Sequence, residues 1–296
     1  IAEGCDKRCT YCIIPYLRGK YRSVPMEQLV REAEELAEKG VKELILVAQE
    51  TTVYGTDLYG KKTLHILLKK LCQIKGIRWI RVLYCYPEEI YDELIQVMKE
   101  EKKICNYLDL PIQHASDRNL KRMGRRTTRK QLEDIIAKLR REIPDIVLRT
   151  SLITGFPGET QEDHEELMEF VDEMEFDRLG VFTYSPEEGT PAETMEGQVP
   201  EEVKEERRDE LMSLQQEISL EKGDERIGQE LLVMIEGKVS GESAYIARTY
   251  ADAPKVDGYI FVQTGELLVT GDFARVRVTG ALEYDLIGEL ADEYTE

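Results

Sequence analysis

The chain is short of positive charge and histidine and has no long apolar run. Lys and Arg number 40 against 59 Asp and Glu, so the formal net charge is −19, and there are only three His residues. Such an acidic chain is poorly suited to binding nucleic acid through counterion release and better suited to a basic partner, although the acid also serves solubility alone. No apolar run reaches the length of a membrane span, so we expect no membrane association.

Cysteine is also scarce and shows no even pairing pattern. Three of the six cysteines, Cys5, Cys9 and Cys12, lie within the first twelve residues. The other three (Cys72, Cys85 and Cys105) are scattered, which predicts free buried thiols. Clustered thiols in a chain of this size are typical of a reduced protein rather than a disulfide framework. We therefore expect a cytoplasmic location.

The first three quarters of the chain alternate between helical and strand patterns. Apolar spacing predicts helices at 24–39, 63–74, 88–101, 117–123, 128–142, 161–174 and 200–223, and strands at 44–48, 77–84, 107–112, 146–153 and 178–184. Repeated strand–helix units of this length predict an α/β fold, a partial (β/α)6 barrel over residues 1–223.

The last quarter of the chain has a different pattern. Helical spacing stops near Gly228, and five short alternating runs follow at 231–239, 245–249, 259–262, 274–279 and 284–290. Gly-rich turns separate several of these runs. We predict a small antiparallel five-stranded β-barrel over residues 224–296.

The clustered cysteines have the spacing C-x3-C-x2-C. Soft thiolates in a tight loop select zinc or an iron–sulfur cluster. Structural zinc takes four ligands and usually a second C-x2-C arm, which this sequence lacks. Three thiolates can hold a cubane and leave one iron open, so Cys5, Cys9 and Cys12 predict a [4Fe–4S] cluster. A zinc-dependent binding module without catalysis is the alternative.

This spacing resembles the signature of the radical S-adenosylmethionine (SAM) superfamily. The resemblance implies that the open iron binds the amino and carboxylate groups of SAM. It also implies that an electron from the cluster cleaves SAM to methionine and a 5′-deoxyadenosyl radical. Tyr11, just before the last cysteine, matches the aromatic residue that lies beside the adenine in this family.

Further segments narrow the resemblance to the methylthiotransferases. Residues 12–23, 110–116 and 154–160 resemble their motifs, and the terminal barrel resembles their TRAM domain. Residues 48–57 and 184–190 are similar to the RimO branch, and the transfer-RNA branch's Gln-Ser-Gly-Ser motif is replaced here by Gln-His-Ala-Ser. This implies a methylthio group added to the β-carbon of an aspartate in a basic small-subunit ribosomal protein. A transfer-RNA adenosine methylthiotransferase is the alternative.

The resemblance also implies a set of cofactor-binding residues. Besides the three cluster ligands, no further catalytic residue is predicted. Gln49 and Gln113 fall at predicted carboxyl ends of strands, where a barrel has its active site. His114 is either a site residue or a structural one. The residues expected to bind SAM are Tyr11, Gln49, Gln113, Arg149, Ser151, Gly155 and Phe156.

Only four residues precede Cys5, so we expect the chain to be a piece of a longer protein. The resemblance implies a second [4Fe–4S] cluster on an N-terminal domain that is not part of this chain, with a role in sulfur delivery. The chain by itself should then bind one cluster and SAM without completing the reaction. The sequence does not identify the electron-donor protein.

Overall fold

A computed structural model describes residues 1–291, which form two compact units. The first unit is Ile1–Leu214, and the second begins at Gln215. The division falls inside a long helix, α9 (Glu201–Asp224). The expected domain boundary after residue 223 lies in the last turn of the same helix and stays a prediction.

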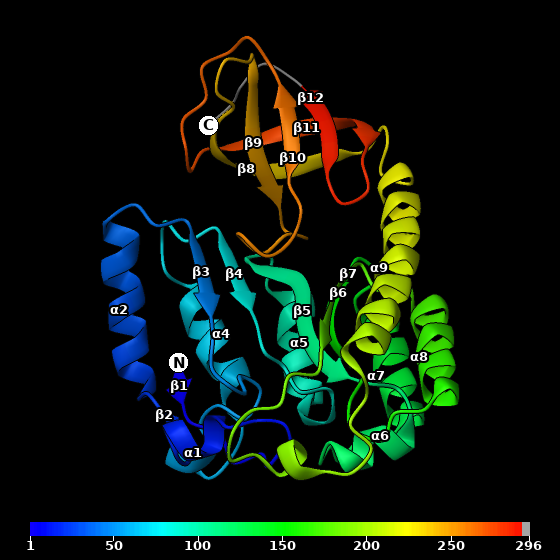
Figure 1. Ribbon diagram of the computed structural model, residues 1–296. Helices are drawn as coiled ribbons and strands as arrows, with labels where there is room; N and C mark the ends of the chain where they lie inside the picture. The colour runs from blue at the N-terminus through cyan, green and yellow to red at the C-terminus, as the bar shows by residue number, and fades with distance from the viewer. Residues whose placement is uncertain (292–296) are drawn as a thin grey trace. The chain divides into compact units, whose positions relative to one another are not determined.

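The first unit is built around a parallel sheet (Figure 1). Its five strands follow the chain in the order β3-β4-β5-β6-β7, and each adjacent pair is parallel. The strands are β3 (Glu43–Leu46), β4 (Trp79–Val82), β5 (Ile104–Gln113), β6 (Val147–Thr154) and β7 (Arg178–Thr183). This confirms the predicted α/β radical SAM type of fold, with five parallel strands in the described part where about six units were expected.

The helices of the first unit connect these strands. Neighbouring helices pack in sequence order along the sheet, α2 on α4, α4 on α5 and α5 on α7. The helices are α1 (Ile14–Arg18), α2 (Met26–Glu38), α3 (Thr56–Tyr59), α4 (Leu64–Cys72), α5 (Asp92–Glu100), α6 (Asp117–Arg122), α7 (Arg129–Glu142) and α8 (Gln161–Met174), with short 3-10 turns η1 (Pro87–Glu89) and η2 (Pro191–Thr194). The short helices α1 and α3 were not predicted, because one turn is too short to show an apolar period.

The two faces of the sheet differ in burial. Along β6, Leu148, Thr150 and Leu152 are fully buried, whereas Arg149 and Ser151 are partly exposed. Successive side chains of a strand point to opposite faces. At β6, one face of the sheet is therefore packed core, and the other, which we call the open face, carries the polar side chains of Arg149 and Ser151.

The cysteine loop begins at the first residues of the chain. Strand β1 (Ala2–Glu3) pairs with β2 (Arg22–Ser23), and the loop and α1 lie between them. Gly4 has a φ of 83°, and a Cβ there would lie 2.2 Å from the carbonyl oxygen of Lys20. A residue with a side chain would push the two ends of the loop apart.

The second unit contains a closed five-stranded barrel, as the sequence predicts, and its strand order is β10-β12-β11-β8-β9. Its strands are β8 (Glu230–Lys238), β9 (Ala244–Thr249), β10 (Ile260–Gln263), β11 (Phe273–Ala281) and β12 (Leu286–Leu290), around a core that includes Val233, Ala247, Val262 and Val276. The barrel differs from the expected all-antiparallel one, because β10 and β12 pair in parallel. Strand directions cannot alternate all the way around a closed ring of five, so at least one pair must be parallel.

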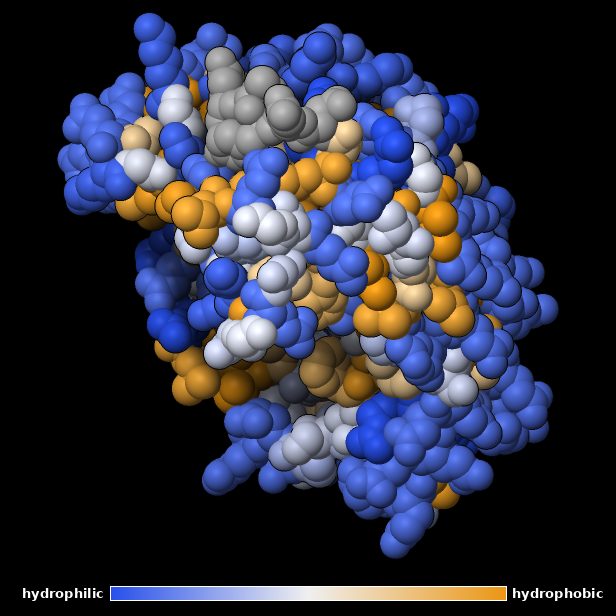
Figure 2. All heavy atoms as spheres, turned by 90° about the horizontal axis from the view of Figure 1, so that it is seen from above, coloured by the Kyte–Doolittle hydropathy of each residue, from blue (hydrophilic) through white to orange (hydrophobic). Residues whose placement is uncertain are grey.

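The surface agrees with the high content of charged residues, which is 33% of the chain. The face seen in Figure 2 is mostly hydrophilic, with hydrophobic side chains gathered in smaller areas. Among residues 1–291, no helix combines the length and the apolar composition that crossing a membrane requires.

Candidate active site

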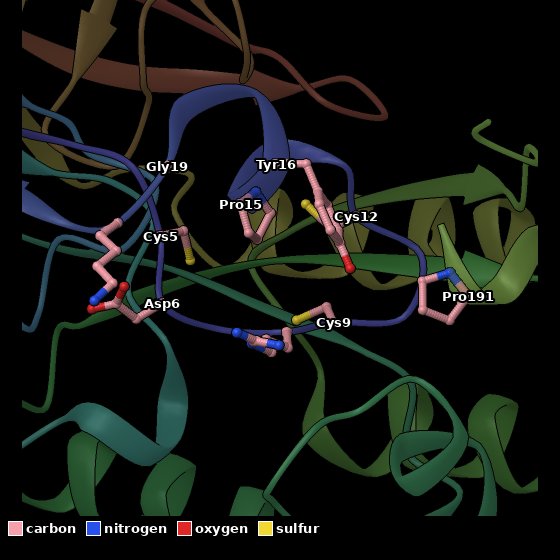
Figure 3. Close-up of a pocket in the computed structure, with 10 residues that line it drawn as sticks. Cys5, Asp6, Cys9, Cys12, Pro15, Tyr16, Gly19 and Pro191 are labelled. Carbon is pink, nitrogen blue, oxygen red and sulfur yellow. The ribbon is translucent and has the colours of Figure 1, made fainter. Parts of the chain in front are cut away.

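Cys5, Cys9 and Cys12 line one cavity, and Figure 3 shows their side chains around it. The cavity has a volume of about 590 Å³. Cys5 and Cys9 are buried, and Cys12 is partly exposed. The remaining lining comes from the same loop, from α1 and from η2, namely Asp6, Arg8, Pro15, Tyr16, Gly19, Lys20 and Pro191.

Backbone hydrogen bonds shape the cysteine loop. The N–H of Cys12 donates to the carbonyl of Cys9 at 3.1 Å, which closes a turn between these two predicted ligands. The N–H of Cys5 donates to the carbonyl of Gly19, also at 3.1 Å. The C-x3-C-x2-C spacing therefore becomes a compact arrangement of three thiols.

Thr10 fastens the loop to the rest of the first unit. Its N–H donates to the carbonyl of Met123 at 2.9 Å, and its hydroxyl donates to the carbonyl of Arg122 at 2.8 Å. Its own carbonyl accepts the N–H of Ala192 at 2.9 Å. The end of α6 and the turn η2 thus hold the loop between Cys9 and Cys12 in place.

Burial favours the protonated form of two of the three thiols, Cys5 and Cys12, before a metal binds. Burial raises the pKa of Cys5 to about 11, and burial also raises the pKa of Cys12. A thiol must lose its proton to bind a metal, so metal loading here is coupled to proton release.

The arrangement fits an iron–sulfur cluster better than zinc. In residues 1–291, no three His, Cys, Asp or Glu side chains are arranged to hold a single metal ion. Structural zinc needs four ligands on one ion. The thiolates of a four-iron cluster bind separate iron atoms, so they surround a cavity without meeting at one point.

Arg149 and Ser151 lie on the open face of the sheet, as their predicted role requires. Nη1 of Arg149 donates to Oδ1 of Asp109 at 2.7 Å, and the hydroxyl of Ser151 lies 3.4 Å from the same nitrogen. The other carboxylate oxygen of Asp109 accepts the N–H of Tyr84 at 3.1 Å. Asp109, which sequence reasoning missed, therefore orients the guanidinium of Arg149.

The two predicted glutamines lie near the carboxyl ends of their strands. Gln113 is the last residue of β5 and has a φ of 74°, a left-handed conformation that is uncommon for a residue with a side chain. Gln49 lies three residues after β3, and its buried Oε1 has no hydrogen-bond partner among the described residues. A buried acceptor without a partner is costly, which is consistent with a ligand that donates to it.

Gly155 and Phe156 serve packing in this structure. A Cβ on Gly155 would lie 2.1 Å from Cγ of Lys204. Phe156 is 0% exposed, and its ring makes edge contacts with Tyr11 and Tyr184 at centroid distances of 6.4 and 5.4 Å. Phe156 therefore supports the ring of Tyr11, the predicted adenine neighbour.

The sequence did not indicate two further residues that lie beside the predicted cluster ligand Cys9. The hydroxyl of Tyr86 lies 3.4 Å from Sγ of Cys9, within hydrogen-bonding distance for sulfur. The guanidinium of Arg125 lies over the ring of Tyr86, 4.1 Å from its centroid. Two features of the sequence could have pointed to these residues. Tyr86 comes shortly after the strand predicted at 77–84, and Arg125 belongs to the basic run that follows α6.

His114 has a structural role. Its Nδ1 accepts the backbone N–H groups of Ala115 and Ser116 at 3.0 and 2.9 Å. Its Nε2 faces the buried carboxylate of Glu159 at 3.4 Å, and Arg207 of α9 donates to that carboxylate at 2.7 Å. This network ties the loops after β5 and β6 to α9.

The family model of the Radical SAM superfamily matches residues 1–171, more than half of the chain, and includes the three cysteines. The chain belongs to the radical SAM superfamily. A second family model, the TRAM domain, matches residues 227–291, which contain the barrel.

Curated relatives of this radical SAM chain are ribosomal protein uS12 methylthiotransferases RimO. The protein from Lachnoclostridium phytofermentans is 66% identical over 288 residues, which are 97% of this chain and 66% of that protein. Those from Pelotomaculum thermopropionicum and Clostridium perfringens are 57% and 56% identical over 98% and 99% of this chain. The predicted resemblance to the RimO branch is confirmed. The chain spans 65–66% of the length of these relatives.

Among solved structures, the chain is similar to the radical SAM methyltransferase TsrM from Kitasatospora setae. The TM-score is 0.51 at 18% identity, and the match covers 64% of this chain and 37% of TsrM. At this identity the similarity concerns the fold.

Family membership implies a [4Fe–4S] cluster and SAM. The donor set of this chain fits the cluster, because three soft thiols line one cavity with no fourth cysteine beside them. The buried, unpartnered Oε1 of Gln49 and the polar open face fit a bound polar cofactor.

Proposed function

We propose that this chain is the catalytic core of a methylthiotransferase that modifies the β-carbon of an aspartate in ribosomal protein uS12. The observation that carries the proposal is the 53–66% identity to uS12 methylthiotransferases over nearly the whole chain. A cytoplasmic location, where ribosomal proteins are found, is part of the proposal.

Different residues of the first unit would bind the cluster and SAM. Cys5, Cys9 and Cys12 would hold the cluster. The cluster and SAM, when bound, supply the reductive chemistry that generates a carbon radical. Arg149, held by Asp109, would orient the charged end of SAM together with the residues that share the open face or border it, namely Ser151, Gln113 and Gln49. Tyr11, supported by Phe156, would pack beside the adenine.

We assign the barrel a role in docking the substrate. Residues 228–296 contain five Lys and Arg against thirteen Asp and Glu. Arg248 and Arg277 already form ion pairs with acids of the same barrel, Arg248 with Glu236 at 2.6 Å and Arg277 with Glu230 at 2.7 Å. Such a surface favours a basic ribosomal protein over the phosphates of RNA.

In this proposal, the second cluster and the sulfur it would deliver belong to residues outside this chain.

Hydrogen abstraction can be tested without the sulfur-transfer step. The reconstituted chain is given SAM, a reductant and uS12 whose aspartates carry deuterium at the β-carbon. We expect deuterium in the 5′-deoxyadenosine product, measured by mass spectrometry, and none with a Cys12→Ala variant.

Two results would contradict the proposal. One is formation of 5′-deoxyadenosine without deuterium in the presence of bound uS12. The other is deuterium transfer from labelled adenosine of a transfer RNA, which would favour the transfer-RNA branch of the family instead.

A further inference from the structure

One segment of this acidic chain is strongly basic. Residues 117–130, which run from α6 to the start of α7, contain seven Lys and Arg and a single acid, whereas the whole chain has a net charge of −19. The middle of the segment touches the cysteine loop, because Thr10 hydrogen bonds to the carbonyls of Arg122 and Met123. Positive charge is therefore concentrated next to the predicted cluster.

A small second cavity, of about 190 Å³, lies beside Cys9. Half of its lining residues are cationic and Glu88 is the one acid among them, the full set being Lys7, Arg8, Cys9, Tyr86, Glu88, Gly124, Arg125 and Arg126. We call the four cations of this set, Lys7, Arg8, Arg125 and Arg126, the basic rim. Both cavities share Arg8 and Cys9, so Cys9 lies between them.

The basic rim has inner and outer members. Lys7 forms an ion pair with Glu89, and the buried Arg125 lies 3.8 Å from the carboxylate of Glu88. Arg8 and Arg126 are exposed and form no ion pair with any residue of the described chain. Arg8 and Arg126 can therefore form ion pairs with a partner protein, whereas Lys7 and Arg125 already face carboxylates of this chain.

At Gly124 the protein surface comes very close to Cys9. Gly124 is exposed and has a φ of 74°. A Cβ there would lie 2.8 Å from the carbonyl oxygen of Arg8 and 3.5 Å from Cα of Cys9. Only one layer of backbone therefore separates a cluster ligand from solvent at this point. On the inner side, the Tyr86 hydroxyl lies 3.4 Å from the Cys9 sulfur.

We propose that the basic rim and Gly124 form the docking surface of an acidic one-electron-donor protein, and that electrons enter the cluster on the Cys9 side. The charges complement an acidic partner, and electron transfer requires a short path between the two redox groups. This inference rests on one part of the proposed function, the cluster held by the three cysteines, and does not depend on uS12 being the substrate. A reduced flavodoxin suits the chemistry, since its anionic flavin hydroquinone loses one electron to become the neutral semiquinone while the cluster gains that electron. No bond breaks and no proton needs to move.

The test measures cluster reduction, not turnover. The chain with a reconstituted cluster is mixed with flavodoxin hydroquinone, and the loss of cluster absorbance is followed in a stopped-flow instrument. Arg126→Glu should lower the second-order rate constant about tenfold at low salt, and high salt should remove most of the difference. Lys39→Glu is the matched control, because Lys39 is exposed at the end of α2 and lines neither cavity.

Further measurements distinguish weaker docking of flavodoxin from a damaged cluster, from an effect of net charge and from an RNA contact. Iron content and photochemical reduction by a small deazaflavin should be unchanged in Arg126→Glu, so a lower rate reflects docking. An equal decrease in Lys39→Glu would show an effect of net charge alone and overturn the proposal. Weaker binding of ribosomal RNA by Arg126→Glu, with unchanged reduction by flavodoxin, would identify an RNA contact and overturn it as well.

Discussion

Cys9 differs from the other two cysteines of the motif in its surroundings. It borders both cavities, forms a turn with Cys12 and has the Tyr86 hydroxyl beside its sulfur. A Cys9 sulfur bound to iron would carry no proton, so the Tyr86 hydroxyl would be the donor of this hydrogen bond. Hydrogen bonds to cluster sulfurs are one of the means by which a protein sets the reduction potential.

Replacing Cys9 by Ala should prevent assembly of a stable cluster. With one of three thiolates missing, we expect reconstituted iron to fall from about four atoms per chain to well below that value, together with loss of SAM cleavage. Iron analysis and absorption spectra measure the change. A stable iron content of about eight in the unchanged chain would instead indicate a second cluster site.

Cys72→Ala is the control for this prediction. Cys72 is also buried, but it lies in α4 and lines neither cavity. This substitution should cost about 1 kcal/mol of stability through lost packing and leave iron binding unchanged. Normal SAM cleavage by Cys9→Ala would rule out the assigned ligand set.

At the scale of elements, α8 shows how a local signal is reinforced by distant residues. Thr160 and Asp163 form a reciprocal capping box at its start. The structure adds two partners from the start of α6, because Ser116 donates to Asp163 at 2.7 Å and Arg118 forms an ion pair with it. The helix start is thus tied to the segment that follows β5.

Asp163→Asn should destabilise the protein at neutral pH. Burial alone would raise the pKa of Asp163, but hydrogen bonds from Arg118, Ser116 and Thr160 outweigh it and hold the pKa below its usual value. A carboxylate with a lowered pKa in the folded state stabilises the fold above its unfolded value of 3.8, and this contribution is lost as the pH falls through the folded pKa. We expect a loss of about 1–2 kcal/mol at pH 7.

Urea denaturation followed by circular dichroism measures this difference across pH. The gap between Asp163→Asn and the unchanged chain should shrink as the pH falls below 3.8. Glu165→Gln, an exposed change in the next turn of α8, should have little effect at any pH. A gap that stays constant from neutral to acid pH would show that the carboxylate charge is not what stabilises the helix.

At the scale of the whole molecule, the sign of the charge varies along the chain. The segment that contains the barrel is strongly acidic, and the segment beside the cysteine loop is basic. Net charge alone therefore describes this protein poorly. Each region is suited to a partner of the opposite charge.

Neutralising exposed acids of the barrel should weaken binding of the basic ribosomal protein. The triple variant Glu242→Gln, Glu266→Gln and Glu283→Gln should raise the dissociation constant for uS12 on the order of tenfold at low salt, and high salt should weaken binding by the unchanged chain. Glu34→Gln, Glu35→Gln and Glu38→Gln in α2 form the matched control, with the same change in net charge. Tighter binding of transfer RNA than of uS12 by the unchanged chain at low salt would contradict this role of the barrel.

Features that depend on spacing along the chain could be predicted before the structure was known. Helix and strand periods predicted most elements within a few residues, since backbone hydrogen bonding and side-chain direction repeat over short distances. The C-x3-C-x2-C spacing was enough to predict the three cluster ligands, because all three lie on one loop, and this ligand set stays a prediction.

Contacts between residues that are far apart in the chain could not be predicted in this way and follow from the packing of the folded chain. Asp109 and Arg149 are 40 residues apart in the chain, and Cys9 and Tyr86 are 77 apart. The side chain of Lys204 in α9 fills the space where a Cβ on Gly155 would lie, a contact that the sequence does not show, and the expected approach of a ligand to Gly155 stays a prediction. Such contacts depend on how strands and helices of different segments pack together, and no local period in the sequence encodes that packing.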